Sequence, residues 1–312
     1  MALGNEDFEK HVLARKAKPP AILYKYATVE TARSILSSGK LRFQSPYQYN
    51  DPFDSQWNPL WQLDTAEALE YERWLIKRAL LYPASWPTDA DPQHQHSMAQ
   101  ERMRIEALPR EAREQAIADF VEELIARPRM SDHYVGRSSE IRRRMRVCCF
   151  SETECSLLMW SHYAAQHRGV VLGFEASILE RGLRRPLERV DYQEQFPEWF
   201  DPQKLQMSIL FGLKWSWDFT NWERRWALTK HKEWAYEREW RFVTIAPATQ
   251  PGEYQDVSFS QESLVEIIVG CRVEKAPAAE IQLLARRLRA GMRCSRMDTH
   301  KTRFELVKTN LK

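Results

Sequence analysis

Short, largely apolar runs of strand length recur along this chain at irregular intervals, and they constrain its fold more than any other feature. The runs lie at residues 22–26, 147–150, 169–174, 240–245, 264–269 and 304–307. Runs of this length are typical of buried strands. Because the segments between them differ widely in length, there is no regular alternation of strand and helix. We therefore expect an α+β fold with a mixed sheet.

Helical patterns lie between these runs. Apolar residues recur at helical spacing from about residue 60 to 145, which predicts a helical insertion. Shorter helices are expected near residues 28–36, 156–166 and 278–290. Residues 1–20 read as a polar leader, and residues 21–312 as a single domain that is enlarged by the insertion.

Glycine is scarce, with only 10 in 312 residues, and neither GxGxxG nor GxxxxGK[ST] occurs. Both motifs need glycine so that the backbone can approach a phosphate closely, which argues against Rossmann and P-loop enzymes. The 46 basic and 43 acidic residues nearly cancel. This balance neither requires nor excludes a nucleic-acid partner.

The five cysteines form no CxxC pair, and no run of 18 apolar residues is present. These features predict a reduced, cytoplasmic protein that does not associate with membranes. A cysteine nucleophile such as Cys149 is disfavoured, because it lies in a predicted interior strand, where thiols are usually inert. His94 and His96 lack further local ligands, so no metal is expected.

Two glutamates, Glu237 and Glu239, open the run at 240–245. Side chains alternate along a strand, so both point to the same face. Paired carboxylates suit sugar chemistry, in which one stabilises a cationic sugar and the other activates a nucleophile. Taken alone, the pair is more often a solvated strand face.

The segment from Asn50 to Asp54 combines turn-forming residues. Asp51 is expected to cap a helix that begins at Pro52. In the functional alternative, Asp51 and Asp54 bind a metal or substrate. Together with Glu237 and Glu239 they would then form a metal-dependent nuclease site.

A third group of candidates follows the run at 147–150. Trp160, Tyr163 and His167 share one face of the predicted helix, with His162 to one side. Such an aromatic face stacks a flat heterocycle such as nicotinamide or adenine, or else it packs into the core.

Two segments, 137–146 and 272–303, are rich in arginine. On the predicted helix near 278–290, Arg286, Arg287 and Arg289 should face outward, where they could track phosphates. This pattern favours an alternative function, a non-catalytic nucleic-acid or protein-binding module in a defence or stress pathway.

Taken together, the motifs resemble one bacterial family, the domain of unknown function 2971, over roughly residues 22–270. The motifs are Leu23–Tyr26, Asn50–Asp54, Cys149–Ser151, Met159–Ala164 with His167 and Gly169, and Trp234–Arg241. The family name supplies no activity.

A second resemblance, to ADP-ribosyltransferases, does imply one. Those enzymes carry a basic residue after Leu-Tyr in their first strand, where this chain has Lys25. A strand with a serine, here Ser151, and a strand led by Glu-x-Glu, here Glu237 and Glu239, follow in the same order. The resemblance implies a mainly antiparallel split β-sheet core with flanking helices, and NAD as a substrate.

By this resemblance Glu239 is the catalytic carboxylate on the nicotinamide ribose, and Glu237 positions or activates the acceptor. Lys25 contacts the NAD diphosphate or ribose, Ser151 supports the site, and Tyr163 or Tyr26 stacks on nicotinamide. The other residues expected to contact NAD are Tyr24, Asn50, Asp51, Trp160 and His162. We therefore predict an NAD-consuming glycosyltransferase, a toxin or anti-phage effector, whose acceptor is RNA, DNA or protein.

Overall fold

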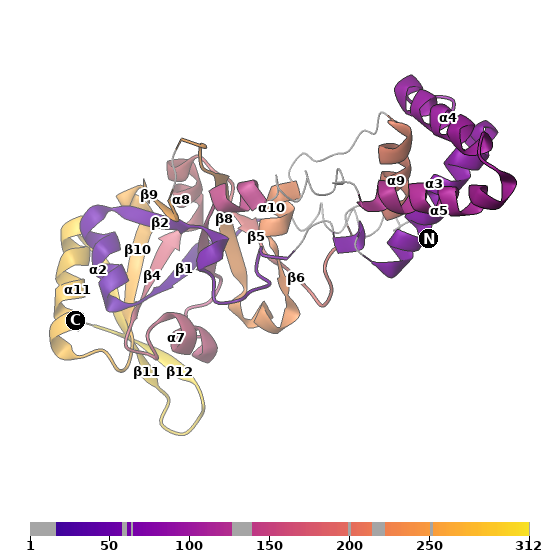
Figure 1. The fold of residues 1–312 in the computed structure, drawn as a ribbon. Helices are drawn as coiled ribbons and strands as arrows, with labels where there is room; N and C mark the ends of the chain where they lie inside the picture. The colour runs from indigo at the N-terminus through magenta and orange to yellow at the C-terminus, as the bar shows by residue number, and fades with distance from the viewer. Residues whose placement is uncertain are drawn as a thin grey trace. The chain divides into compact units, whose positions relative to one another are not determined.

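In the computed structural model, the chain forms two compact units (Figure 1). Unit 1 comprises Met1–Trp57, Ile141–Gln195 and Glu223–Lys312, and unit 2 comprises Asn58–Glu140 and Phe196–Trp222. The structure describes residues 17–57, 61–63, 65–126, 139–198, 201–213, 222–249 and 252–311. Most of the predicted leader, residues 1–16, lies outside this part.

Unit 1 is built on one large sheet. In spatial order its main path is β12 (Leu306–Asn310), β11 (Arg293–Thr299), β10 (Leu264–Val269), β4 (Val170–Glu175), β1 (Ile22–Ala27), β3 (Met145–Ser151), β2 (Lys40–Gln44) and β9 (Tyr254–Ser258). Off this path, β8 (Glu239–Ile245) pairs with β3 and with β5 (Glu188–Arg189). All of these pairs are antiparallel except β10 with β11. The predicted α+β class is therefore confirmed, with a largely antiparallel, open sheet.

Strand β3 is the junction of this sheet. It pairs along its whole length with β8, while two strands share its other edge. Ser151 lies opposite Tyr24 of β1, and Val147 lies opposite Gln44 of β2. The end of β3 and the start of β8 therefore meet the middle of β1 at Ser151.

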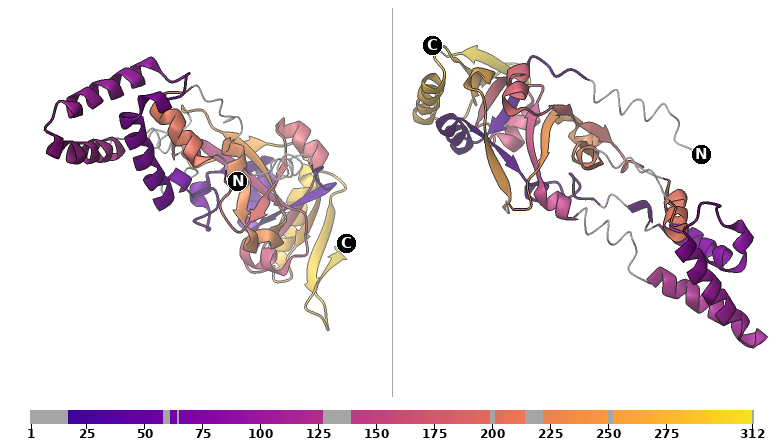
Figure 2. Two further views of the ribbon diagram at one scale, coloured as in Figure 1. Left: turned by 90° about the vertical axis from the view of Figure 1, so that its right-hand side faces the viewer. Right: turned by 90° about the horizontal axis from the view of Figure 1, so that it is seen from above.

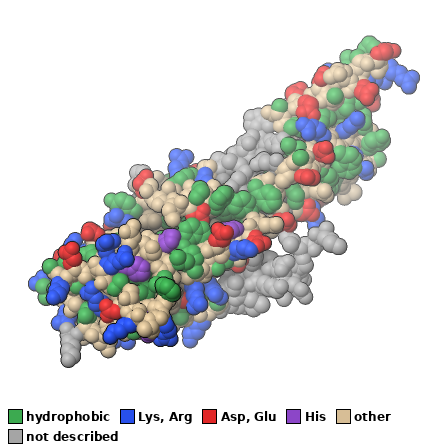
Figure 3. Space-filling model, turned by 90° about the horizontal axis from the view of Figure 1, so that it is seen from below, with side chains coloured by type: hydrophobic (Ala, Val, Ile, Leu, Met, Phe, Trp, Pro, Cys, Tyr) green, Lys and Arg blue, Asp and Glu red, His purple; other side chains and the backbone are tan. Residues whose placement is uncertain are grey.

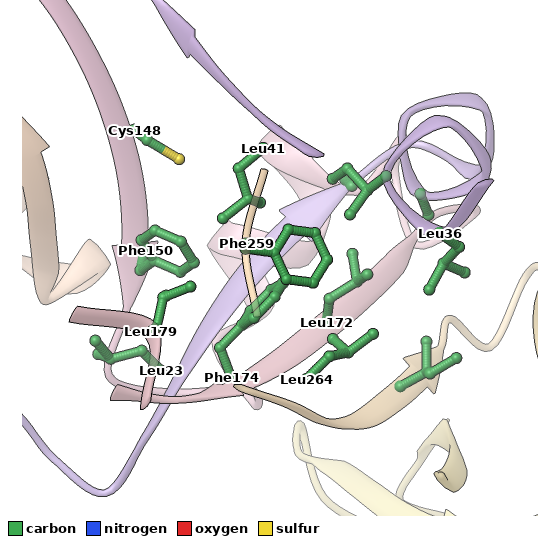
Figure 4. Close-up of a cluster of buried hydrophobic side chains, with 14 of the residues drawn as sticks. Leu23, Leu36, Leu41, Cys148, Phe150, Leu172, Phe174, Leu179, Phe259 and Leu264 are labelled. Carbon is green, nitrogen blue, oxygen red and sulfur yellow. The ribbon is translucent and has the colours of Figure 1, made fainter. Parts of the chain in front are cut away.

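The main hydrophobic core lies on one face of this sheet. Leu23, Leu172, Phe174 and Phe150 point from the strands into this core (Figure 4). Helices α2 (Val29–Ser38), α8 (Ala176–Leu183) and α11 (Lys275–Leu288) bury apolar side chains against it. The views of Figures 1 and 2 agree that α2 and α11 lie side by side.

Helix α2 matches the helix predicted near residues 28–36. Thr28 accepts a hydrogen bond from the Thr31 amide as its N-cap. Gly39 ends the helix with a φ of 64°, a left-handed conformation that glycine adopts without steric cost.

The opposite face of the sheet carries a smaller apolar cluster beneath α7 (Leu157–Tyr163). This helix is shorter than predicted, because Ala165, Gln166 and His167 all have positive φ. His167 is therefore not on the helix, although its ring still stacks on that of Trp160, with centroids 6.3 Å apart.

Smaller elements complete unit 1. The strands β6 (Asp191–Gln193) and β7 (Thr229–His231) form a separate parallel pair. Helix α10 (Trp222–Ala227) precedes β7, and the 3-10 turn η4 (Lys232–Glu237) leads from β7 into β8. Further 3-10 turns are η1 (Pro46–Gln48) and η5 (Gln261–Ser263).

Unit 2 is helical, as predicted for the insertion. The helices α3 (Ala66–Leu81), α4 (Pro92–Glu106), α5 (Arg110–Ala126) and α9 (Pro202–Phe211) share one apolar core. The turn η2 (Trp61–Leu63) precedes α3, and η3 (Pro83–Ser85) lies between α3 and α4. The unit adds residues 196–222 to the segment expected from the sequence. That the two units make up one domain stays a prediction. Within the described part of the chain, no helix has the length and apolarity needed to cross a membrane.

Candidate functional site

Three of the predicted segments meet in one row across the sheet of unit 1. Tyr24 of β1 lies opposite Ser151 of β3, and Ser151 lies opposite Glu239 of β8. Residues in register on adjacent strands point to the same face. The row therefore brings Tyr24, Ser151 and Glu239 to the face that α7 covers.

Beside this row lies a buried group of charges, which we call the charged cluster: Asp54, Lys230, Glu237, Glu239 and Arg241. None of these residues is more than 7% exposed. The sequence prediction included the two glutamates and left Asp54 open. It did not include Lys230 or Arg241.

Arg241 joins two of the carboxylates. Its guanidinium donates to Asp54 at 2.7 and 2.6 Å and to Glu239 at 2.9 and 2.7 Å. The fifth N–H bonds the carbonyl oxygen of Ala227 at 2.7 Å. All five donors are thus satisfied, as a buried guanidinium requires.

Lys230, on β7, is the second cation of the cluster. Its Nζ lies 2.6 Å from Glu237 Oε2, 3.4 Å from Glu239 Oε2 and 3.3 Å from Asp54 Oδ2. Burial lowers the pKa of Lys230, but the surrounding carboxylates outweigh this and raise it well above its ordinary value. Lys230 therefore stays charged.

The two glutamates have opposite pKa shifts. Burial raises the pKa of Glu239, but Arg241 and then Lys230 outweigh this and hold it well below its ordinary value. Burial, and then the negative charge of Glu239, raise the pKa of Glu237 to about 7. At neutral pH, Glu239 is ionised while Glu237 exchanges a proton readily, a division found in acid–base sites.

A half-exposed aromatic group borders Glu237. The hydroxyl of Tyr163 donates to Glu237 Oε1 at 2.6 Å. His162 lies between the rings of Tyr163 and Tyr236, with centroids 6.2 and 6.3 Å away, and Trp234 lies 6.0 Å from Tyr236. We call these four residues the aromatic platform.

Ser151 positions the glutamates through the backbone. Its hydroxyl donates to the carbonyl oxygen of Glu237 at 2.6 Å and accepts from the Thr153 amide. The Glu239 amide donates to the hydroxyl of Tyr192 at 2.8 Å. Ser151 therefore supports the turn that separates the two glutamates.

Lys25 is not brought to the carboxylates. It alternates with Tyr24 on β1, so it lies on the opposite face of the sheet. Its ammonium donates to the Cys149 carbonyl oxygen at 3.2 Å and lies 5.3 Å from the centre of the Phe150 ring.

The aromatic residues Tyr24, Tyr26 and Trp160 are held by local partners. Tyr24 donates to Glu266 at 3.3 Å, Tyr26 to the Thr153 carbonyl oxygen at 2.8 Å, and Trp160 to the Glu154 carbonyl oxygen at 2.6 Å. Trp160 and Tyr26 pack edge to face in the smaller apolar cluster. Their observed contacts are those of core residues.

The segment from Asn50 to Asp54 forms a turn and not the expected helix. Asn50 is exposed, and Asp51 accepts from the Phe53 amide at 2.9 Å. The capping role expected of Asp51 is thus present, but it caps a turn. Asp54 instead enters the charged cluster.

The three predicted phosphate-binding arginines differ in their surroundings. Arg286 and Arg287 are exposed on α11. Arg289 follows the end of the helix, and its guanidinium bonds the carbonyl oxygens of Glu262 and Leu264. The expected outward face is therefore wrong for Arg289, because the backbone becomes extended at that residue.

The cysteine thiols and the possible metal ligands are the remaining candidates from the sequence. All five cysteines are free, and burial raises the pKa of both Cys148 and Cys149, as expected for inert thiols. Among the described residues, no group of three His, Cys, Asp or Glu side chains is placed to hold a metal ion.

Three members of the site could have been found from the sequence, while Lys230 could not. Arg241 follows Glu239 by two residues on a strand, so alternation places both on one face. Trp234 and Tyr236 lie within a motif of the first family resemblance but carried no predicted role. Lys230 has no local signal, because only the turn at η4 returns Glu237 to it.

Comparison with protein families gives a match to part of the chain. The model of a family described as a protein of unknown function (DUF2971) matches residues 159–242. No curated protein and no solved structure matches the chain. The matched residues run from α7 to β8 and contain the aromatic platform and every member of the charged cluster except Asp54. The resemblance predicted from the motifs over roughly residues 22–270 is therefore confirmed for residues 159–242, the part of the chain that the family model matches.

Proposed function

We propose that this chain is an NAD-consuming glycosyltransferase whose sheet is a split core of the ADP-ribosyltransferase type. The observation that carries the proposal is the row of Tyr24, Ser151 and Glu239 across three neighbouring strands, with Glu237 beside it. These residues come from the three motifs that suggest the activity, and they are far apart in the sequence. Their convergence supports a shared role.

The proposed chemistry divides the work between the two glutamates. The bond between nicotinamide and ribose breaks, nicotinamide leaves with the bonding electron pair, and a cationic sugar remains. Glu239, ionised and held rigidly by Arg241, stabilises that cation. An acceptor hydroxyl or amine then bonds to the sugar carbon and gives its proton to Glu237, whose pKa of about 7 suits a general base.

The aromatic platform supports NAD as the substrate class. Its rings are only partly buried and border the carboxylate that would act as the base. A flat heterocycle such as nicotinamide gains stacking energy on such rings. Tyr163 belongs to the platform and also bonds Glu237, so a stacked ring would lie close to that carboxylate.

The test is release of nicotinamide from NAD by the purified chain, with RNA, DNA and protein mixtures as acceptors. We expect Glu239→Gln to reduce turnover at least about 100-fold, since it removes the charge that faces the cation. Glu188→Gln is the matched control. Glu188 pairs with Arg224 at 2.6 Å outside the charged cluster, so turnover should stay near that of the wild type.

A second pair of variants separates the two glutamates. Glu237→Gln should lower turnover and abolish the rise of rate with pH near 7, because the base is lost. Tyr163→Phe keeps the ring but removes the hydrogen bond to Glu237, so it should shift that pH dependence. Full turnover in Glu239→Gln, or no nicotinamide release with any acceptor, would contradict the proposal.

One observation favours a second candidate, a non-catalytic binding module. Each carboxylate of the charged cluster already has a cation as its partner, so the cluster is also suited to fixing the fold. This candidate predicts an inactive chain in which Glu239→Gln changes stability alone. The same pairing occupies the oxygens that a metal ion would need, which argues against the nuclease alternative.

A further inference from the structure

A second surface of unit 1 combines exposed tyrosines with arginines at the ends of β2, β3 and β9. Its members are Arg42, Tyr47, Arg142 and Tyr254, which we call the arginine–tyrosine strip. Arg42 lies over the Tyr254 ring, 3.9 Å from its centre. Arg142 donates to the Tyr47 hydroxyl at 2.9 Å and lies 4.8 Å from the centre of its ring.

The sheet holds these two pairs close together. Tyr254 lies opposite Gln44, the last residue of β2, and the next amide, that of Ser45, donates to the Glu253 carbonyl oxygen at 2.7 Å. The turn η1, which carries Tyr47, follows at once. The two tyrosines therefore flank the same strand end.

Both rings are open to solvent. Tyr254 is 57% exposed and Tyr47 is 42% exposed. A guanidinium against one side of a ring leaves the rest of its surface accessible. Exposed aromatic rings beside arginines provide the stacking surface that single-stranded nucleic acids use, because every base has a π face.

The surrounding charge has the sign that a phosphate backbone needs. Residues 40–44, 141–146 and 253–258 contain six basic and two acidic residues, and five of the basic side chains, all except the buried Arg146, reach the surface. One of the acids, Asp256, is bonded to Arg42 in a bidentate pair. The local excess of positive charge contrasts with the near-neutral whole chain, and Figure 3 shows acidic and basic side chains interspersed on the face it draws.

We propose that the arginine–tyrosine strip binds single-stranded nucleic acid, with bases stacked on Tyr47 and Tyr254 and phosphates held by the nearby arginines. An aliphatic partner would find few apolar side chains here, and an acidic peptide would leave the rings unused. This site is distinct from the exposed arginines of α11.

The strip lies on the same face of the sheet as the candidate site. Val147, which pairs with Gln44, and Ser151, which pairs with Glu239, are four residues apart on β3. An even separation keeps both on one face, about 13 Å apart along the strand. A nucleic acid bound here could present a nucleotide to the candidate site as the acceptor. That role rests on the proposed function, whereas the binding of nucleic acid does not.

The test is fluorescence anisotropy of a labelled 12-nucleotide single-stranded RNA of mixed sequence, without NAD. We expect binding that weakens roughly tenfold between 50 and 200 mM salt, as for a few phosphate contacts. Tyr254→Ala should weaken binding by about fivefold or more, and the double variant with Tyr47→Ala by more still. Both residues are exposed, and circular dichroism should show an unchanged fold.

Two controls identify the surface. Tyr82→Ala changes a tyrosine that is 63% exposed but lies in unit 2, and it should keep wild-type affinity. Arg286→Ala with Arg287→Ala tests the face of α11 and should also have little effect. Wild-type affinity in the double tyrosine variant, equal affinity for a duplex of the same sequence, or equal displacement of the RNA by polyglutamate would overturn the proposal. Since no NAD is present, these results do not depend on the proposed transferase activity.

Discussion

Replacing Arg241 by methionine tests how strongly the charged cluster stabilises unit 1. Arg241 is 0% exposed and supplies five hydrogen bonds, four of them to Asp54 and Glu239. Methionine fills similar volume without charge, so two buried carboxylates lose their main partner. Removing one partner from a buried ion pair costs about 3–5 kcal/mol, because a charge is left without compensation.

This loss should be visible in the melting temperature. For a unit of about 200 residues, a loss of 1 kcal/mol lowers Tm by roughly 2–4 °C, so we expect a decrease of roughly 6–20 °C. Differential scanning calorimetry measures it directly, with the transitions of the two units fitted separately. Adding Asp54→Asn and Glu239→Gln should recover part of the loss, because both uncompensated charges are then removed.

The matched control is Arg33→Met. Arg33 also forms a two-pronged bond to a carboxylate, that of Glu280, but both side chains are 40% or more exposed. Solvent screens such a pair, so the Tm of Arg33→Met should differ from that of the wild type by less than about 3 °C. If Arg241→Met destabilised the chain no more than Arg33→Met, the cluster would not be desolvated and the account of its energetics would be refuted.

Three further predictions concern groups at or near the site. In the folded chain Glu237 holds its proton up to about pH 7, whereas in the unfolded chain it loses the proton near its ordinary pKa, so the free energy of unfolding should fall as pH rises from about 5 to 7. Urea denaturation at a series of pH values measures this fall, and Glu237→Gln should remove it. If the variant and the wild type showed the same pH dependence, the assigned pKa would be wrong. Ser151→Ala leaves the Glu237 carbonyl oxygen without its donor and should destabilise the chain by about 1 kcal/mol in the same assay, whereas Ser177→Ala, at an exposed serine, should not. Gly39→Ala places a side chain at a φ of 64° and should also cost about 1 kcal/mol, although the space around it is empty; no change would argue against the left-handed cap.

The central strands were readable from the sequence, because each is buried on both faces and therefore appears as an apolar run. The run at 264–269 coincides with β10, and the run at 240–245 with all but the first residue of β8. Strand β11 was not predicted, because its sequence RCSRMDT is largely polar. The last strand begins at Leu306 and not at Phe304, which is fully exposed in the preceding turn.

The candidate site was predictable only in part. The expected strand alternation between Glu237 and Glu239 is wrong, because Glu237 ends η4, Arg238 has a φ of 45° and β8 begins only at Glu239. The order of the motifs did suggest that the segments containing Tyr24, Ser151 and Glu239 belong together. Pairing register, which no local pattern encodes, decides that these three form a row and that Lys25 faces away from it. Likewise Asp54 reaches the cluster from a turn and Lys230 from the short strand β7, and tertiary packing decides the position of both.

Transfer of label from NAD, labelled in its adenylate phosphate, to an acceptor measures the proposed transferase reaction itself. Wild-type chain, Glu239→Gln and Glu188→Gln are incubated with RNA, DNA or protein, and the covalently bound label is counted. We expect incorporation into one acceptor class by the wild type and by Glu188→Gln, with a loss of about 100-fold or more in Glu239→Gln. Incorporation that is unaffected by Glu239→Gln, or none into any of the three classes, would contradict the proposed reaction.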